Sequence, residues 1–321
     1  MSTFETLDAP ASLAAAGPSA WHREPAPIAS WRFELPPDCR VELEAFAAEP
    51  TADGAPAPRL PATRAWMRAL RERVDGGLGL ALVEGVPLAG RAEPEQRRLA
   101  ATVLGQFGRL VPQKLDGTRV YDVRDERPPP GLRVRRSTTN VSQELHTDGG
   151  WLHHTPAYIA LTCLKQAPSG GISRLSSLAA AHDTMRETCP DLLARLYRPL
   201  CWDRQSEHEP EAARFSREPL FFHDTVGVAG RYYDDYVREG QRLAREPLDA
   251  MAEDALETLR ELVEAERGVA TLRLEEGQML VLDNRRLLHA RTGFEDASVT
   301  VRRHLLRIWI RDDGAATLEG R

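Results

Sequence analysis

The chain has 321 residues, and its 42 basic and 48 acidic side chains leave a formal net charge of −6. Hydrophobic residues make up 42% of the sequence, which is typical of a globular protein and excludes a disordered or fibrous one. No run of 18 apolar residues predicts a membrane span and no secretion signal is recognisable, so we expect a cytoplasmic protein that binds no membrane.

The basic residues are almost all arginines, because lysine occurs only at Lys114 and Lys165. The arginines are spread along an acidic chain and form no basic stretch that could follow a phosphate backbone, so we expect no nucleic-acid partner. The four cysteines are too few and too irregularly spaced for a disulfide framework or a zinc site. Small molecules are the expected ligands.

Helices are expected early in the chain and strands mainly after them. Trp66, Leu70 and Val74 recur at the spacing of one helical face, whereas Tyr158–Leu164 is continuously apolar, as in a strand buried on both faces. In chain order, the predicted elements are a helix at Pro61–Asp75, a strand at Leu78–Val83, a helix at Glu93–Phe107, strands at Val120–Val123, Tyr158–Leu164 and Leu175–Ser176, a helix at Leu248–Glu266, a hairpin of Val269–Leu274 and Gln278–Leu282, and a strand at Val299–Ile310.

The order of these elements favours an antiparallel α+β fold, because regular βαβ units are missing. A double-stranded β-helix (jelly roll) core flanked by helices fits this order. We expect residues 1–40 to form an N-terminal arm, which Trp21 and Trp31 anchor on the core. Residues 41–321 are expected to form a single jelly-roll domain, since the Pro- and Gly-rich breaks are too short to separate further domains.

The segment Glu144–Trp151 (ELHTDGGW) contains the single His-x-Asp triplet of the sequence. On a strand, residues two positions apart point to the same side, so His146 and Asp148 can present an imidazole and a carboxylate to one point. Such a triplet is half of a metal chelate, although on its own it also fits a surface turn. A mononuclear iron(II) oxygenase uses two histidines and one carboxylate on one face of an octahedron.

His289 is the candidate for the third ligand, because it follows the predicted hairpin and lies beside apolar residues. Without a partner motif it would instead be a buried core histidine. A motif does follow at 302–309 (RRHLLRIW), and as a strand it places Arg303 and Arg307 on one face. A guanidinium there could grip a carboxylate through two parallel hydrogen bonds, although a half-exposed strand with solvated charges has the same pattern.

Four segments taken together resemble the taurine dioxygenase-like (TauD/TfdA) family of iron(II)- and 2-oxoglutarate-dependent oxygenases, and within it the clavaminate synthase-like members. These segments are ELHTDGGW, SGGISRL, DNRRLLHART and RRHLLR, and the resemblance extends over nearly the whole chain. It implies that His146, Asp148 and His289 bind Fe(II). It also implies that Arg303 binds the distal (C5) carboxylate of the co-substrate 2-oxoglutarate, and that O2 is the second co-substrate.

Two more residues are singled out by the resemblance. Ser173 lies where the family commonly has a threonine whose hydroxyl touches the same carboxylate, so this chain keeps the hydroxyl on a different residue. Arg307 matches an arginine that meets an anionic group of the substrate in some members, which suggests an anionic small molecule as substrate. Asp148 argues against a halogenating enzyme, because halogenating relatives carry a small residue in its place.

The implied protein is a 2-oxoglutarate-dependent non-haem iron dioxygenase. It would oxidise, and by default hydroxylate, a C–H bond of a small molecule with release of succinate and CO2, while desaturation, epoxidation or ring closure are alternative outcomes. A non-catalytic jelly roll that binds metal and 2-oxoglutarate is a second hypothesis, disfavoured by the complete ligand set. A zinc or manganese hydrolase is a third, but it would leave Arg303 and Ser173 without a role.

Overall fold

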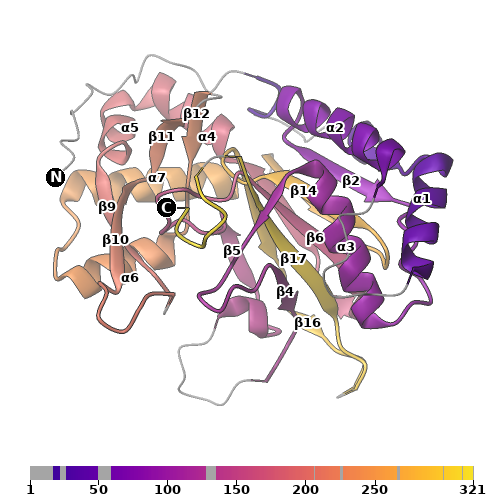
Figure 1. Cartoon of the computed structure of the whole chain (residues 1–321). Helices are drawn as coiled ribbons and strands as arrows, with labels where there is room; N and C mark the ends of the chain where they lie inside the picture. The colour runs from indigo at the N-terminus through magenta and orange to yellow at the C-terminus, as the bar shows by residue number, and fades with distance from the viewer. Residues whose placement is uncertain are drawn as a thin grey trace.

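Two β-sheets form the centre of the protein (Figure 1). The computed structural model describes residues 17–21, 27–49, 59–127, 135–205, 207–224, 227–265, 268–298, 300–312 and 314–320. Within these residues, the larger sheet has seven strands, in the order β1 (Arg32–Glu34), β2 (Leu80–Glu84), β14 (Met279–Asp283), β6 (Tyr158–Lys165), β17 (His304–Arg311) and β3 (Arg109–Val111), with β4 (Val120–Val123) also paired to β17. The smaller sheet has four, in the order β13 (Val269–Leu272), β8 (Ser173–Ser177), β15 (Leu287–Arg291) and β5 (Gln143–His146).

Three helices cover the outer face of the larger sheet, seen in purple in Figure 1. They are α1 (Pro37–Ala48), α2 (Pro61–Gly76) and α3 (Glu93–Phe107). Their apolar faces, including Met67, Leu70 and Leu104, share one hydrophobic core with Val281 and Ile308 of the sheet. The helical periodicity predicted this layer, because α3 has the predicted bounds and α2 extends the predicted helix by one residue.

A second hydrophobic core lies between the two sheets and extends under the remaining helices. Leu280 and Leu305 of the larger sheet contribute to it, as do Leu175 and Leu288 of the smaller one. These helices are α4 (Leu178–Thr188), α5 (Pro190–Leu196), α6 (Asp234–Ala244) and α7 (Ala250–Glu264). Three short two-stranded sheets are also described, and they pair β9 (Pro199–Asp203) with β10 (Phe215–Pro219), β11 (Phe221–Asp224) with β12 (Gly227–Gly230), and β7 (Ser169–Gly170) with β16 (Phe294–Glu295). This arrangement confirms the predicted α+β class, a jelly-roll core flanked by helices.

Strand β17 separates the two cores, because its side chains alternate between them. Leu306 and Ile308 point into the core under α1–α3, whereas Leu305 and Trp309 point between the sheets. All eight residues of the strand are buried. The predicted alternation of this segment is therefore confirmed, and it directs Arg307 into the space between the sheets.

The predicted hairpin of Val269–Leu274 and Gln278–Leu282 is wrong. Strand β13 pairs with β8 in the smaller sheet, whereas β14 pairs with β2 and β6 in the larger one. The turn at 275–277 thus carries the chain from one sheet to the other. Two strands joined by a short turn have the same sequence pattern whether they pair with each other or belong to two stacked sheets. The pattern alone therefore could not distinguish a hairpin from a crossing between sheets.

The described part of the N-terminal segment is packed on the core. Trp21 and Trp31 are buried in the core between the sheets, as expected for anchors, and β1 adds a parallel strand beside β2. The predicted arm boundary at residue 40 falls inside α1, while residues 1–16 and 22–26 lie outside the described residues. None of the helices in the described ranges combines the length and apolar character that crossing a bilayer requires.

Candidate active site

Three side chains with metal-ligand chemistry meet between the two sheets. The ligand atoms of His146, Asp148 and His289 all lie within 4.8 Å of one another, and all three residues are buried. The structure therefore brings together the three residues that the sequence singled out, although His289 comes from a distant part of the chain. We refer to these three residues as the triad.

The backbone explains how the triad forms. Strands β5 and β15 are neighbours, and His146 pairs directly with His289 across them, which leaves their ring centroids 4.2 Å apart. The sequence predicted that His146 and Asp148 lie on one strand, and this is wrong. Strand β5 ends at His146, and Asp148 lies in the turn that follows. Gly149 permits this turn with a φ of +66°, and a Cβ there would lie 2.8 Å from Pro156 Cδ.

The local contacts of His146 fix which ring nitrogen carries the proton. Its Nδ1 lies 2.8 Å from the backbone oxygen of Glu144, and since a carbonyl can only accept, Nδ1 must donate. The lone pair is therefore on Nε2, which lies 2.9 Å from the amide nitrogen of Gln143 and 3.6 Å from Asp148 Oδ1. This is the tautomer that a metal ligand binding through Nε2 requires.

His289 is uncharged and has an unused ring nitrogen. Burial, followed by the neighbouring His146, lowers the pKa of His289 to about 3, although Asp148 opposes this shift. Its buried Nδ1 has no hydrogen-bond partner within the part of the chain that the structure describes. A neutral imidazole is the form that binds metal without first losing a proton.

Asp148 is held as a carboxylate by two donors on β17. Arg307 Nη1 donates to Oδ1 at 2.9 Å, and Trp309 Nε1 donates to Oδ2 at 2.9 Å. Burial raises the pKa of Asp148, but the Arg307 charge and His146 outweigh burial and hold the pKa below its usual range. Arg307 also donates through Nε to Gln113 Oε1 at 2.8 Å, so its guanidinium is fixed beside the triad.

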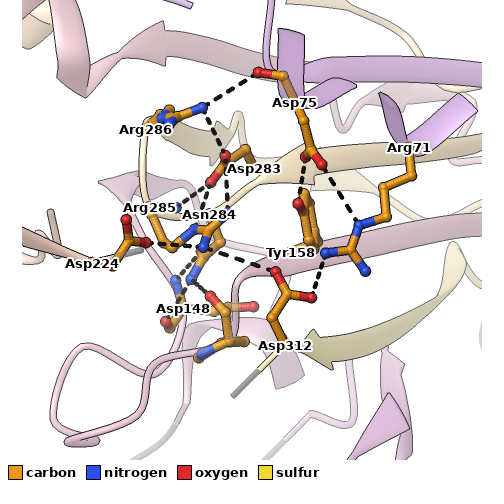
Figure 2. A network of polar contacts seen from close by, with 11 residues as sticks. Arg71, Asp75, Asp148, Tyr158, Asp224, Asp283, Asn284, Arg285, Arg286 and Asp312 are labelled. Carbon is orange, nitrogen blue, oxygen red and sulfur yellow. Dashed lines mark hydrogen bonds and ion pairs between the residues drawn. The ribbon is translucent and has the colours of Figure 1, made fainter. Parts of the chain in front are cut away.

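Asn284 holds the backbone of Asp148 from below, a contact that sequence reasoning missed. Its Oδ1 accepts from the Asp148 amide at 2.8 Å, and its Nδ2 donates to the carbonyls of Asp148 and Pro156, both at 3.0 Å. Figure 2 shows this grip beside the charged turn between β14 and β15, where Arg285 donates to Asp283 and to Asp224. The sequence did offer one indication of this role, since Asn284 lies between two apolar strands. Asparagine is common in turns, where its side chain forms hydrogen bonds with backbone groups.

We expect Asn284→Ala to weaken Fe(II) binding by about 10-fold to 100-fold, because supports of metal ligands typically contribute that much. The variant removes all three hydrogen bonds and leaves the Asp148 turn unsupported. Anaerobic titration of the metal-free protein with Fe(II) measures the effect. Asn140→Ala is the matched control, since the Asn140 side chain is exposed, and equal iron affinity in both variants would rule out a positioning role for Asn284.

The triad lies where two pockets meet. The first pocket, of ≈ 390 Å³, includes His146 and Asp148 together with Trp151, Tyr236 and Trp309. The second, of ≈ 420 Å³, includes His289 together with Ser173, Arg291 and Arg303. Both pockets contain Ser137, Gln143 and Arg307. A metal held by the triad would therefore be open to one ligand from each side.

Arg303 occupies the second pocket with unsatisfied donors. It is 2% exposed, its Nε donates to Gln166 Oε1 at 3.2 Å, and its buried Nη1 has no partner. Burial, followed by the positive charge of Arg291, lowers the pKa of Arg303 to about 10, so the group is still a cation at neutral pH. Gly171, with a φ of +66°, makes room for it, because a Cβ there would lie 2.7 Å from Arg303 Nε.

A second cluster of possible ligands does not resemble a cation site. Glu93, Asp122 and His304 also lie close together. However, Arg97 already pairs with Asp122, and His304 Nε2 lies 2.8 Å from the same carboxylate. An arginine occupies the position that a metal would need, so we interpret this cluster as an ion-pair network on the side of α3.

The donor set of the triad fits iron(II). Two neutral imidazoles and one ionised carboxylate on one side of a metal leave the remaining octahedral positions open, which is the arrangement of non-haem iron oxygenases. The orphaned Nδ1 of His289 and the unpaired guanidinium of Arg303 are observations that a bound metal and a bound carboxylate would explain. The second pocket therefore offers a buried cation to a carboxylate.

Comparison with known proteins gives a consistent result. Residues 35–309 match the family described as "Taurine catabolism dioxygenase TauD, TfdA family". FR-33289 synthase of Streptomyces rubellomurinus is 28% identical over 92% of this chain and 89% of its own. Uridine-5'-phosphate dioxygenase of an Amycolatopsis species is 30% identical over 71% of this chain and 83% of its own.

A solved structure shares the fold. Asparagine oxygenase in complex with Fe(II), 2S,3S-3-hydroxyasparagine and succinate superposes with a TM-score of 0.66 over 88% of this chain and 93% of that one. The sequence identity is 18%, so this likeness establishes the jelly-roll architecture alone.

Proposed function

Because the chain belongs to the TauD/TfdA family of dioxygenases, we propose that it hydroxylates a C–H bond of an anionic small molecule while 2-oxoglutarate is converted to succinate and CO2. The protein is a non-haem iron dioxygenase whose metal is Fe(II) and whose co-substrates are 2-oxoglutarate and O2. The observation that carries the proposal is the position of the triad between two pockets, one of which contains a buried guanidinium, that of Arg303, whose Nη1 has no hydrogen-bond partner among the described residues.

In this proposal His146, Asp148 and His289 hold the iron, which supplies the oxidising chemistry when it is bound. Arg303 and Ser173 bind the distal carboxylate of 2-oxoglutarate in the second pocket. This contact directs the other end of the co-substrate toward the triad. Positioning of this kind converts an encounter between separate molecules into a reaction within one complex.

The first pocket would then hold the substrate. Trp151, Tyr236 and Trp309 form the aromatic part of its otherwise mostly polar lining. Arg307, which pairs with Asp148, and Arg135, which pairs with Glu207, also line this pocket, as does Arg136. These guanidinium groups favour a carboxylate, phosphonate or phosphate on the substrate. One relative is named for uridine 5'-phosphate, which is such an anion.

The proposal predicts one succinate for each substrate molecule oxidised and a product heavier by one oxygen atom. The measurement incubates the iron(II)-loaded protein with 2-oxoglutarate, ascorbate and O2, and with pairs of anionic substrates and their neutral esters. Mass spectrometry detects the product, and succinate is quantified in parallel. Oxidation that proceeds equally well without 2-oxoglutarate would contradict the proposal. A product lighter by two hydrogen atoms would show that the reaction is a desaturation and not a hydroxylation. A preference for the neutral esters would contradict an anionic substrate.

A further inference from the structure

Arg291 faces the second pocket from the strand that carries His289. It lies two residues after His289 on β15, so both side chains point to the same face of the smaller sheet. It lines the second pocket together with Ser173 and Arg303. Only 7% of Arg291 is exposed.

The register of the sheet places Arg291 next to Ser173. The two residues are direct partners across β15 and β8. Directly opposite residues in an antiparallel pair have their Cβ atoms about 4.5–5.5 Å apart and point to the same face. A ligand group that touches the Ser173 hydroxyl is therefore within reach of the Arg291 guanidinium.

Arg291 and Arg303 both pack against Phe294, and the charge of Arg291 contributes to the lowered pKa of Arg303. The guanidinium carbon of Arg291 is 4.8 Å from the centre of the Phe294 ring, and that of Arg303 is 5.2 Å from the same centre. In the part of the chain that the structure describes, neither arginine forms an ion pair within 4.0 Å. Two buried like charges repel each other and lack the hydration that water would give them. Asp125 acts on Arg291 and Asp296 on Arg303 from beyond ion-pair distance, and a bound anion would offset the two charges further.

The hydrogen bonds of Arg291 are incomplete. Its Nη2 donates to the backbone carbonyls of Thr139, at 3.0 Å, and Val141. Its Nε and Nη1 are buried and have no hydrogen-bond partner in the described ranges. Arg303 Nη1 also has no hydrogen-bond partner among the described residues, and both arginines line the second pocket.

We propose that Arg291 is a second arginine for the distal carboxylate of 2-oxoglutarate, which it binds together with Arg303 and Ser173. This inference rests on the proposed function, because it assigns the same pocket to the same co-substrate. One carboxylate has enough acceptor positions for both guanidinium groups and the hydroxyl. Two cations at one carboxylate make the pocket selective for 2-oxo acids that carry a distal charge.

A purely structural role of Arg291 would affect the binding of 2-oxo acids in a different way. The carbonyls that Arg291 touches belong to the loop before β5, so Arg291 could serve only to hold that loop over the triad. Loss of this support would weaken binding of every 2-oxo acid to the same extent. Loss of a carboxylate contact would weaken only the acids that have a distal carboxylate.

The test measures the dissociation constants of 2-oxoglutarate and 2-oxopentanoate by anaerobic calorimetry on the Fe(II)-loaded full chain. The two acids have the same carbon chain, but 2-oxopentanoate lacks the distal carboxylate. In Arg291→Gln, we expect the preference for 2-oxoglutarate over 2-oxopentanoate to fall by about 10-fold to 100-fold, the contribution of hydrogen bonds to a charged group. The affinity for 2-oxopentanoate should stay the same.

Arg174→Gln is the matched control, because Arg174 follows Ser173 on β8, points to the other face and pairs with Glu264 at 3.0 Å. It should leave the preference unchanged. The inference is overturned if Arg291→Gln weakens binding of both acids by the same factor, or of neither, while Arg303→Gln lowers the preference for 2-oxoglutarate. If Arg303→Gln also leaves the preference unchanged, the assignment of the pocket in the proposed function fails, and the inference fails with it.

Arg291→Lys keeps the test decisive if the glutamine variant does not fold. Lysine retains the charge and the apolar stem against Phe294 but loses the fork geometry of the guanidinium. A fall of about threefold or more in the preference for 2-oxoglutarate supports the contact, since one of several charged hydrogen bonds is lost. An unchanged preference overturns it.

Discussion

Replacing Asp148 with alanine is expected to lower kcat/KM by at least about 10³-fold, equivalent to about 4 kcal/mol. The change removes the carboxylate ligand of the triad and its negative charge, so the site loses one of its three attachments to iron. It also leaves the Arg307 guanidinium buried without its partner, which costs about 3–5 kcal/mol of stability in the metal-free protein. Steady-state kinetics and urea denaturation of the metal-free protein measure the two effects.

Two further variants separate the effects on activity and stability. Asp148→Asn keeps an oxygen that can accept from Arg307 but removes the charge, so it should lose activity to a similar extent and less stability. Asp254→Ala is the control, because Asp254 is exposed on α7, and it should change neither quantity. Wild-type activity in Asp148→Ala would show that the triad is not the site of the reaction.

Replacing Arg303 with glutamine is expected to weaken 2-oxoglutarate binding by about 10²-fold to 10³-fold. Truncating one partner of a buried charged hydrogen bond typically costs 2–5 kcal/mol or more, and each 1.4 kcal/mol is a factor of ten in affinity. Arg303 is the least exposed arginine in the second pocket, and among the described residues its Nη1 has no hydrogen-bond partner. Anaerobic titration gives the dissociation constant, and the KM for 2-oxoglutarate should rise in parallel while iron affinity is retained.

A matched comparison strengthens this prediction. Arg174→Gln changes an arginine on the opposite face of β8 and should bind 2-oxoglutarate as the wild type does. Equal affinities in the wild type and Arg303→Gln would remove the co-substrate from the second pocket. The proposed function would then lose its account of the unpaired guanidinium.

The sequence was informative wherever the signal is local. The predicted helix at Glu93–Phe107 has the bounds of α3, and the apolar run from Tyr158 predicted β6, which ends one residue later than expected. The His-x-Asp triplet identified two of the triad residues because they are two positions apart. His289 was a candidate from its place after the predicted hairpin and beside apolar residues, and the resemblance to a family then implied that it is a ligand, since nothing near it in the chain shows that it faces His146.

The features that the sequence did not predict depend on contacts between distant segments. Asn284 grips a backbone 136 positions away, and the Trp309 indole meets Asp148 only because β17 lies opposite the turn after β5. Arg291 belongs to the second pocket through its register with Ser173, which depends on the pairing of β15 with β8. The false hairpin has the same origin, because a local pattern does not specify which sheet each strand joins.

The most direct test of the account is an anaerobic titration of the metal-free protein, first with Fe(II) and then with 2-oxoglutarate. We expect one tightly bound iron per chain and, on addition of 2-oxoglutarate, a metal-to-ligand charge-transfer absorption band in the visible range. His146→Ala and His289→Ala should each abolish both. If either variant binds iron with the affinity of the wild type and shows the same band, the two imidazoles do not share a metal and the account is contradicted.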